Sequence, residues 1–407
     1  MPKRIAFLTA GGIAPCLSPS IGALIEKYKE IAPDAELIGY LNGYQGLLLG
    51  RSIDFPPAVW ERFHVLYKFG GSAIGNSRVK LTNVNDCVKR GLVQEGQDPL
   101  HVAAEQLKKD RIDILHTIGG DDTNTTAADL AHYLQDNGYG LTVVGLPKTV
   151  DNDVFPIRQT LGAWTAAQEG AMFFENVANE NTTSTRQLII HEVMGRHCGW
   201  LAAATANEYH RSLEHYEWLP ELRISKDRWD VDAVWLPEMG IDLDAECDRL
   251  SQRMDDTDKV HLFLSEGAGV DAIIREKESS GEEVKYDAFG HARIDELNPG
   301  KWFANQLKER LGAEKVLVQK SGYFGRSAAP IEKDLELIKQ SAFAAAEYAL
   351  EGKSGVAGLD EDNNDLMTCI DFSRIKGGKP FDIDVHWFNR LLEEIGQPKG
   401  EKLTVHH

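Results

Sequence analysis

The feature that most constrains this chain is a regular alternation of short β-rich runs with stretches of helical periodicity. The β-rich runs lie at residues 5–9, 112–118, 141–146, 187–193, 233–236 and 260–264. Between and after them, apolar residues recur at helical spacing, as at residues 127–134, 199–208, 301–311 and 335–350. Such alternation is typical of parallel sheets whose faces are covered by helices. The sequence therefore predicts an α/β fold with mainly parallel sheets.

The length of 407 residues suggests two to three domains, or one large α/β unit with insertions. We place one boundary near residue 155. No internal repeat and no low-complexity linker marks a sharper division.

Charge and composition exclude several classes of protein. The formal net charge of −19 makes general binding to nucleic acid or to an anionic membrane a poor prediction. No run of 18 apolar residues is present, so we expect no transmembrane helix. The five cysteines are scattered and form no CxxC pair, which favours a reduced, cytoplasmic protein.

In open α/β sheets, ligands bind beyond the carboxyl ends of the strands, so the residues after each strand are informative. Gly11 and Gly12 follow the first strand and precede a helix start, which suits a phosphate but also a simple tight turn. Asp121 and Asp122 follow the strand that ends at residue 118. They could hold Mg²⁺ beside bound phosphates, or they could only cap the next helix.

The next strand end carries a lysine and two aspartates on one loop. Lys148 could neutralise a phosphate and Asp151 could act as a general base, although an Asx-rich turn is the alternative. Glycine-rich or strand-terminal segments elsewhere supply three arginines, Arg78, Arg196 and Arg326, and arginine suits bidentate phosphate contacts. Three successive strand ends with such residues indicate a phosphate site more strongly than any one of them.

The ordered set of these segments resembles the phosphofructokinase family. The segments are GGDDT at 119–123, PKTVDND at 147–153, EVMGR at 192–196, SEG at 265–267 and GYFGR at 322–326. The resemblance runs from Gly11 to about Asp371. It implies two Rossmann-like domains with the phosphofructokinase fold, an active site in the cleft between them, and Mg²⁺-dependent phosphoryl transfer to the C1 hydroxyl of fructose 6-phosphate. Such a reaction depends on positioning and charge neutralisation rather than covalent catalysis.

The resemblance also implies roles for individual residues. Asp151 falls on the family's catalytic base, Asp121 on the Mg²⁺ ligand and Arg78 on the arginine that neutralises the transferring group. Thr149 joins the catalytic and substrate-binding set, and Gly12 and Thr123 join the donor site. The remaining sugar-phosphate contacts fall on Met194, Gly195, Arg196, Glu266, Tyr323 and Arg326. The chain departs from the family pattern at Cys16-Leu17-Ser18, where a Gly-x-Asn segment is usual.

Two residues indicate the phosphoryl donor. ATP-using members typically carry glycine after the first aspartate and a small residue before the threonine of TxDND, whereas this chain has Asp122 and Lys148. Asp122 would occupy the space of a nucleotide's α-phosphate and oppose its charge. Lys148 would add positive charge for a donor that lacks a nucleoside. The pair resembles the pyrophosphate-dependent branch, so we expect diphosphate as donor. An ATP-dependent kinase and a non-catalytic sugar-phosphate-binding subunit are the alternatives.

We therefore expect a donor domain at residues 1–155 completed by a C-terminal segment, a fructose 6-phosphate domain at 156–330, and a C-terminal helix and segment at 331–407. A further sugar-phosphate arginine, taken in this family from a neighbouring subunit, falls near Arg186 or Gln187, and another basic position near Lys320. If the site borrows such a residue, the protein is at least a dimer. We expect a homodimer or homotetramer that binds diphosphate and fructose 6-phosphate, and neither nucleic acid nor membrane.

Overall fold

The computed structural model describes residues 2–286 and 293–405 of the chain. Its contacts divide the chain into two compact units. Unit 1 comprises Met1–Thr165 and Arg326–Lys379, and unit 2 comprises Ala166–Gly325 and Pro380–His407. In sequence, α7 (Ala163–Asn181) and α14 (Gly322–Ser327) span the boundaries.

Unit 1 is built on a seven-stranded sheet in the order β11-β10-β5-β4-β1-β2-β3. Its strands are β1 (Arg4–Thr9), β2 (Glu36–Tyr40), β3 (Ser52–Asp54), β4 (Ile114–Gly119), β5 (Thr142–Pro147), β10 (Gly355–Asp360) and β11 (Leu366–Ile370). The pairs are parallel except at the two edges, where β2 with β3 and β10 with β11 run antiparallel. The chain leaves β1 toward β2 on one side and later returns to β4 on the other. This reversal is the topological switch point at which such sheets bind ligands.

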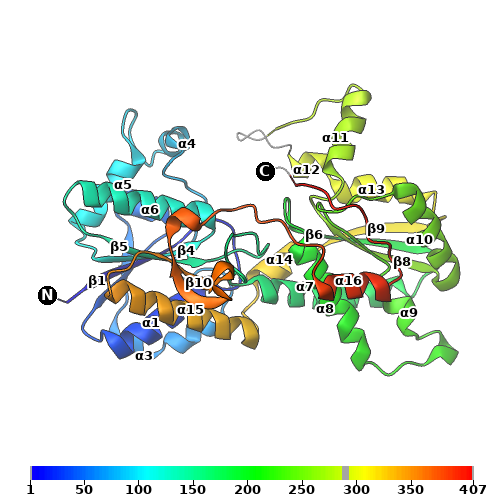
Figure 1. Cartoon of the computed structure of the whole chain (residues 1–407), viewed down its shortest axis with the longest axis horizontal. Coiled ribbons are helices and arrows are strands. Elements are labelled where there is room, and N and C mark those ends of the chain that lie inside the picture. The colour runs from blue at the N-terminus through cyan, green and yellow to red at the C-terminus, as the bar shows by residue number, and fades with distance from the viewer. Residues whose placement is uncertain (1, 287–292, 406–407) are drawn as a thin grey trace. The chain divides into compact units, whose positions relative to one another are not determined.

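Helices cover both faces of this sheet (Figure 1). They are α1 (Leu17–Ile31), α2 (Tyr44–Leu49), α3 (Pro57–Glu61), α4 (Val84–Lys89), α5 (Pro99–Lys109), α6 (Asp121–Asp136) and α15 (Glu332–Leu350). α5 and α6 pack on one face, where Leu107 and Leu130 join Leu115 and Val143 of the strands in one core cluster. α1 and α15 lie together on the other face. The central strands are buried along almost their whole length, as their apolar sequence predicts.

Unit 2 has a four-stranded, wholly parallel sheet in the order β7-β8-β6-β9. Its strands are β6 (Gln187–Val193), β7 (Ala233–Trp235), β8 (Lys259–Ser265) and β9 (Lys315–Lys320). Its other helices are α8 (Trp200–Ser212), α9 (Lys226–Trp229), α10 (Leu243–Thr257), α11 (Val270–Ser279), α12 (Ile294–Leu297), α13 (Pro299–Lys308) and α16 (His386–Glu394). Residues of α10 and α13 pack on β6 and β8 in a second core.

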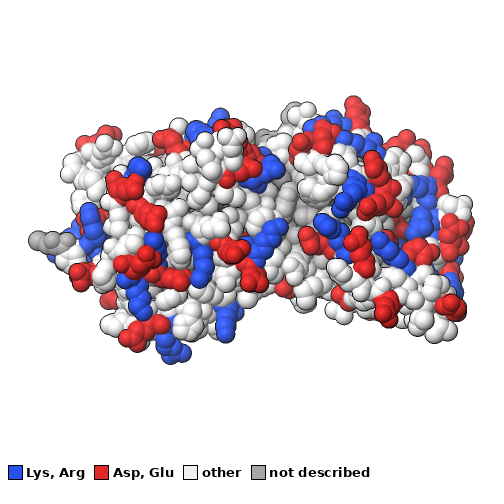
Figure 2. All heavy atoms as spheres, turned by 60° about the horizontal axis from the view of Figure 1, so that its bottom comes forward, with Lys and Arg blue, Asp and Glu red and all other residues white. Residues whose placement is uncertain are grey.

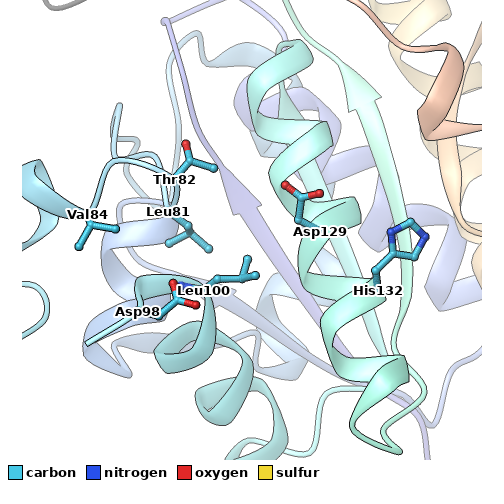
Figure 3. Close-up of a pocket in the computed structure, with 7 residues that line it drawn as sticks. All are labelled: Leu81, Thr82, Val84, Asp98, Leu100, Asp129 and His132. Carbon is cyan, nitrogen blue, oxygen red and sulfur yellow. Dashed lines mark hydrogen bonds between the residues drawn. The ribbon is translucent and has the colours of Figure 1, made fainter. Parts of the chain in front are cut away.

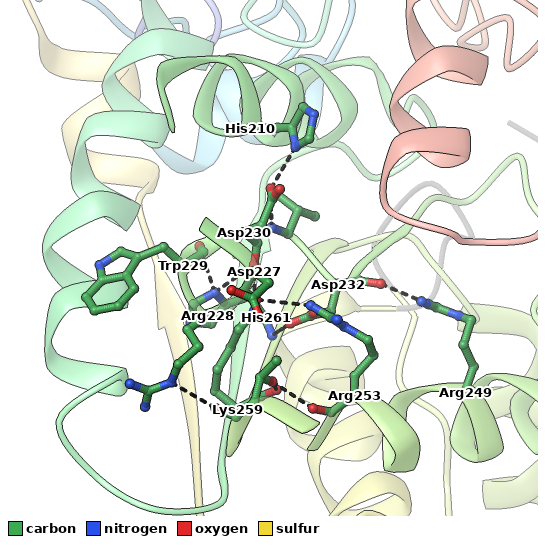
Figure 4. A network of polar contacts seen from close by, with 12 residues as sticks. His210, Asp227, Arg228, Trp229, Asp230, Asp232, Arg249, Arg253, Lys259 and His261 are labelled. Atoms are coloured by element: carbon green, nitrogen blue, oxygen red, sulfur yellow. Dashed lines mark hydrogen bonds and ion pairs between the residues drawn. The ribbon is translucent and has the colours of Figure 1, made fainter. Parts of the chain in front are cut away.

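A network of charges lies at the amino end of the unit 2 sheet (Figure 4). Lys259, the first residue of β8, is fully buried, and its Nζ lies 2.7 Å from Oδ2 of the equally buried Asp232. The Arg253 guanidinium donates to the other carboxylate oxygen at 3.0 Å. Nearby, His210 lies between two carboxylates, 2.6 Å from Asp230 and 2.9 Å from Glu394. These charges join β8, α8, α10 and α16 far from the carboxyl ends of the strands.

The predicted fold class is confirmed, with differences at some element ends. The helix expected at 127–134 begins at Asp121, because Gly120 serves as its N-cap and two acidic residues in the first turn suit the helix dipole. On the face shown in Figure 2, acidic and basic side chains are interspersed rather than separated into fields of one sign. In the described part of the chain, no helix is long and apolar enough to cross a membrane.

Candidate active site

The loop after β1 pairs with the segment that directly precedes Arg78. The backbone N–H of Gly11 donates to the carbonyl of Ser77 at 3.0 Å, and the Asn76 side-chain amide donates to the carbonyl of Gly11 at 2.8 Å. Gly11 has a φ of +88°, which favours glycine at this position. A Cβ added to Gly12 would lie 3.7 Å from Nη2 of Arg78. The structure thus brings Gly12 and Arg78 together.

Lys148 joins the ends of β5 and β1. Its side chain is 4% exposed, and its Nζ donates to the carbonyl of Gly12 at 2.7 Å. Burial lowers the pKa of Lys148, and the nearby Arg78 guanidinium acts in the same direction. An ammonium that is buried beside a second cation, at a loop with close backbone approach, is suited to an anionic ligand.

Asp121 is the first residue of α6, directly after β4. Burial raises the pKa of its carboxyl, and the like charges of Asp122 and Asp153 add to that effect. A bound divalent cation would remove this repulsion. Among the described residues, no three His, Cys, Asp or Glu side chains gather into a preformed metal cage. Mg²⁺ typically takes one or two carboxylates and completes its shell with water and substrate oxygens. The residues present therefore fit Mg²⁺ bound together with a phosphate ligand.

Asp122 and Thr123 occupy the next two positions of α6. Asp122 is largely exposed and forms an ion pair with Lys80. Thr123 is 5% exposed, and its side chain lies close to the backbone of both Gly119 and Gly11. Sequence reasoning missed Lys80, although a basic residue two positions after Arg78 was a usable signal. The ion pair links the loop that follows Arg78 to the first turn of α6.

The loop that carries Asp151 is fixed by hydrogen bonds of its neighbours. The backbone N–H of Asp151 donates to the Thr149 hydroxyl at 3.1 Å, and the Thr160 hydroxyl donates to the carbonyl of Thr149 at 2.8 Å. Asn152 has a φ of +55°, and its side-chain oxygen accepts from the backbone N–H of Thr160 at 2.9 Å. Asp151 is thus held at the end of β5, on the same edge of the sheet as Asp121 and Gly12.

In unit 2, the ends of β6 and β8 form one structure around Gly195. The hydroxyl of Ser265 donates to the carbonyl of Gly195 at 2.6 Å, and the backbone N–H of Gly195 lies 3.4 Å from Oε1 of Glu266. Gly195 has a φ of +130°, so a larger residue there would be strained. A Cβ added to Gly267 would overlap the carbonyl oxygen of Arg196. The structure therefore brings together Gly195, Arg196 and Glu266.

Glu266 and Met194 complete this group. Burial raises the pKa of Glu266, and the charge of Glu192 adds to the effect, whereas Arg196 and Lys320 oppose it. A Cβ added to Gly322, the first residue of α14, would lie 3.6 Å from Sδ of Met194. The end of β9 therefore lies beside the ends of β6 and β8.

The remaining predicted sugar-phosphate residues, Tyr323 and Arg326, lie on α14. Tyr323 belongs to unit 2 and is 78% exposed, whereas Arg326 is the first residue of the second segment of unit 1. Lys320 ends β9 and lies 2.5 Å from Oε1 of Glu192. Arg186 lies at the amino end of β6, where it binds Asp255 and the carbonyls of Leu311 and Gly312.

A shallow pocket elsewhere in unit 1 lies on later turns of α6 (Figure 3). It is lined by Leu81, Thr82, Val84, Asp98, Leu100, Asp129 and His132. It does not include the strand-end residues described above. The predicted site residues of unit 1 therefore meet at the edge of the sheet and not in this pocket.

Comparison with known proteins decides the family. The phosphofructokinase family matches residues 4–349. The chain belongs to the phosphofructokinase family. A relative from Methylomonas methanica, named pyrophosphate–fructose 6-phosphate 1-phosphotransferase, is 61% identical over 100% of this chain and 99% of its own length. A relative of the same name from Propionibacterium freudenreichii is 57% identical over 98% of each chain.

Solved structures of phosphofructokinases share the fold. The pyrophosphate-dependent phosphofructokinase from Marinobacter aquaeolei matches with a TM-score of 0.70 at 21% identity, over 98% of this chain and 92% of its own. A second pyrophosphate-dependent phosphofructokinase, from Nitrosospira multiformis, matches with a TM-score of 0.69 at 20% identity, over 100% of this chain and 94% of its own. The phosphofructokinase match ends at residue 349, so the segment that contains β10 and β11 lies beyond it.

Proposed function

We propose that this phosphofructokinase transfers a phosphoryl group from diphosphate to the C1 hydroxyl of fructose 6-phosphate, giving fructose 1,6-bisphosphate and phosphate. The observation that carries the proposal is the strand-end group of unit 1. There a buried Lys148 lies on the carbonyl of Gly12, and Asp122 pairs with Lys80. The relatives that are 56% to 61% identical to the chain bear the name of this activity.

Each residue of unit 1 then has a definite task. Asp151 accepts the proton of the C1 hydroxyl as the hydroxyl oxygen bonds to phosphorus and the P–O–P bond breaks. Arg78 and Lys148 hold the charge of the diphosphate oxygens. Asp121 would hold Mg²⁺, which when bound neutralises the developing charge on the phosphate oxygens. Gly12 and Thr123 keep the backbone close to the donor.

Asp122 acts in this proposal as a barrier to longer donors. Its side chain would occupy the space that the α-phosphate of a nucleotide needs, and its negative charge would oppose that group. The ion pair with Lys80 holds the carboxylate at this position. Donor choice would therefore come from repulsion of the wrong donor as well as attraction of the right one.

Residues 194–196 and Glu266 would bind fructose 6-phosphate, with Tyr323 and Arg326 at its phosphate. The fixed backbone at Gly195 and Gly267 sets the loop that presents Arg196. We expect a cytoplasmic homodimer or homotetramer. Light scattering on the purified protein would then give two or four times the chain mass of 45.2 kDa.

The direct test is formation of fructose 1,6-bisphosphate from fructose 6-phosphate and Mg²⁺, with diphosphate and ATP compared side by side. We expect activity with diphosphate and none with ATP. Activity with ATP alone would overturn the assignment of the donor while leaving the family intact. Failure with both donors would contradict the proposed reaction.

A further inference from the structure

The tail of unit 1 pairs with the loop that follows Asp151. Phe155 and Lys376 exchange backbone hydrogen bonds, with N···O distances of 2.7 Å and 3.0 Å. The backbone N–H of Lys379 donates to the carbonyl of Asp153 at 2.8 Å. Residues 376–379, with the sequence Lys-Gly-Gly-Lys, therefore run alongside the residues that come directly after Asp151.

Gly377, at the centre of this segment, lies against the carboxylate of Asp121. A Cβ added to Gly377 would lie 2.5 Å from Cγ of Asp121 and would overlap its Oδ2. The backbone of Gly377 is therefore packed directly on the carboxylate, and any side chain there must displace one or the other. The requirement for glycine is steric at this position.

The segment is also anchored at its far end. Nζ of Lys379 lies 2.5 Å from the carbonyl of Ile157 and 3.0 Å from Oε1 of Glu361. The backbone N–H of Glu361 in turn donates to the carbonyl of Pro156 at 2.9 Å. These contacts fix Gly377 between the loop of residues 153–157 and α6.

Gly377 lies outside the residues that the family match covers, which end at residue 349, whereas Asp121 lies within them. The relative that is 61% identical matches the whole chain, including the tail. The contact is therefore an addition to the matched part of the fold, supplied by the tail.

We propose that Gly377 is a positioning residue for Asp121, and that the tail fixes this carboxylate relative to the Asp151 loop. The inference rests on the proposed function, in which Asp121 holds Mg²⁺ with the diphosphate. The backbone of Gly377 limits the positions open to the Asp121 carboxylate. The backbone pairing of Lys376 with Phe155 holds Gly377 beside the loop that carries Asp151. Outer-shell contacts of this kind typically change metal affinity 10- to 100-fold when they are altered.

The test compares Gly377→Ala with a matched glycine variant. Gly377→Ala should raise the Mg²⁺ concentration for half-maximal rate by about tenfold, because the added Cβ displaces the Asp121 carboxylate, and leave the KM for fructose 6-phosphate unchanged. Mg²⁺ and diphosphate together, without sugar phosphate, should raise the melting temperature of the parent protein. Gly377→Ala should reduce this rise, and the measurement needs no turnover. Gly355→Ala is the control, because a Cβ there would overlap the carbonyl oxygen of Ile370 and lie 2.8 Å from Sγ of Cys369, both on β11. It should lower stability and leave the Mg²⁺ requirement unchanged.

Two further variants separate the possible failures. Lys379→Met removes the anchor without adding volume and should raise the Mg²⁺ requirement less than Gly377→Ala does. Asp121→Asn should abolish the joint effect of Mg²⁺ and diphosphate on melting. If Asp121→Asn abolishes it while Gly377→Ala and Lys379→Met leave both Mg²⁺ readouts unchanged, the positioning role is wrong and the proposed function stands. If Asp121→Asn has no effect either, the metal role of Asp121 is wrong and the inference fails with it.

Discussion

Two groups of charged side chains in this molecule differ in how their charges are balanced. At the amino end of the unit 2 sheet, burial opposes ionisation of Asp232, but the attraction of Lys259 and Arg253 outweighs it and lowers its pKa. At the carboxyl ends of the unit 1 strands, burial and two neighbouring carboxylates raise the pKa of Asp121, and burial lowers that of Lys148.

The difference shows how a structural ion network can be told from a binding site. In unit 2 the protein supplies the partners of its own buried charges, so the network needs no ligand. In unit 1 the carboxylate of Asp121 is repelled by Asp122 and Asp153. The buried Lys148 is repelled by Arg78, although Asp151 and Asp153 attract it. Bound Mg²⁺ would offset the repulsion among the carboxylates, and bound diphosphate the repulsion between the two cations. Substitutions in the unit 2 network should therefore lower stability, whereas substitutions at the unit 1 strand ends should lower activity.

The largest effect is expected at the predicted base. Asp151→Ser should lower kcat by about a thousandfold, within the range of general base catalysis, because no group remains to accept the hydroxyl proton. Affinity for fructose 6-phosphate, measured by calorimetry, should change little. Near-normal turnover would remove Asp151 from this role.

The unit 2 network should respond in stability instead. Asp232→Asn leaves Lys259 buried without its countercharge. We expect the free energy of unfolding, measured in urea, to fall by about 3–5 kcal/mol. The kcat of the folded variant should stay close to that of the parent. Asp34→Asn, at an exposed position, is the control and should change the free energy of unfolding by less than about 0.5 kcal/mol. A large loss of kcat with normal stability would contradict the comparison.

A smaller, pH-dependent effect is expected at His210. Burial opposes its protonation, but the hydrogen bonds to Asp230 and Glu394 outweigh this and raise its pKa, with Lys226 acting against them. The protonated ring therefore stabilises the fold fully below the unfolded pKa of about 6.5, and this contribution is lost as pH rises through the folded value.

His210→Gln should accordingly reduce stability by about 1–2 kcal/mol more at pH 6 than at pH 9, the scale of a hydrogen bond to a charged group. Urea unfolding at both pH values measures the difference. The exposed His64→Gln serves as the control. An equal loss at both pH values would show that protonation of His210 contributes nothing.

Much of the fold could be predicted because the central strands are continuous apolar runs in the sequence. β1, β4, β6 and β8 are buried on both faces, and their continuous apolar runs showed in the sequence. β9 was missed because it is only partly buried and has lysines at both ends. The edge pair β10 and β11 was missed as well, since β10 contains two glycines.

The site was predictable where a residue type and a strand end coincide, as for Asp121 and Lys148. Their roles remain predictions. Gly377 had no such signal, because its contact with Asp121 depends on how a distant tail pairs with the loop after Asp151. Lys80 lies two positions after Arg78, but its ion pair with Asp122 joins a loop to the first turn of α6, and that pairing could not be predicted from the sequence.

In the proposed reaction, the charges at the unit 1 strand ends select the donor. Steady-state kinetics of the Asp122→Gly, Lys148→Gly double variant, with diphosphate and with ATP, test it most directly. We predict that kcat/KM for diphosphate falls by about a hundredfold or more, the scale of losing a preorganised charge at a reacting phosphate. Unchanged kinetics with diphosphate would contradict the claim.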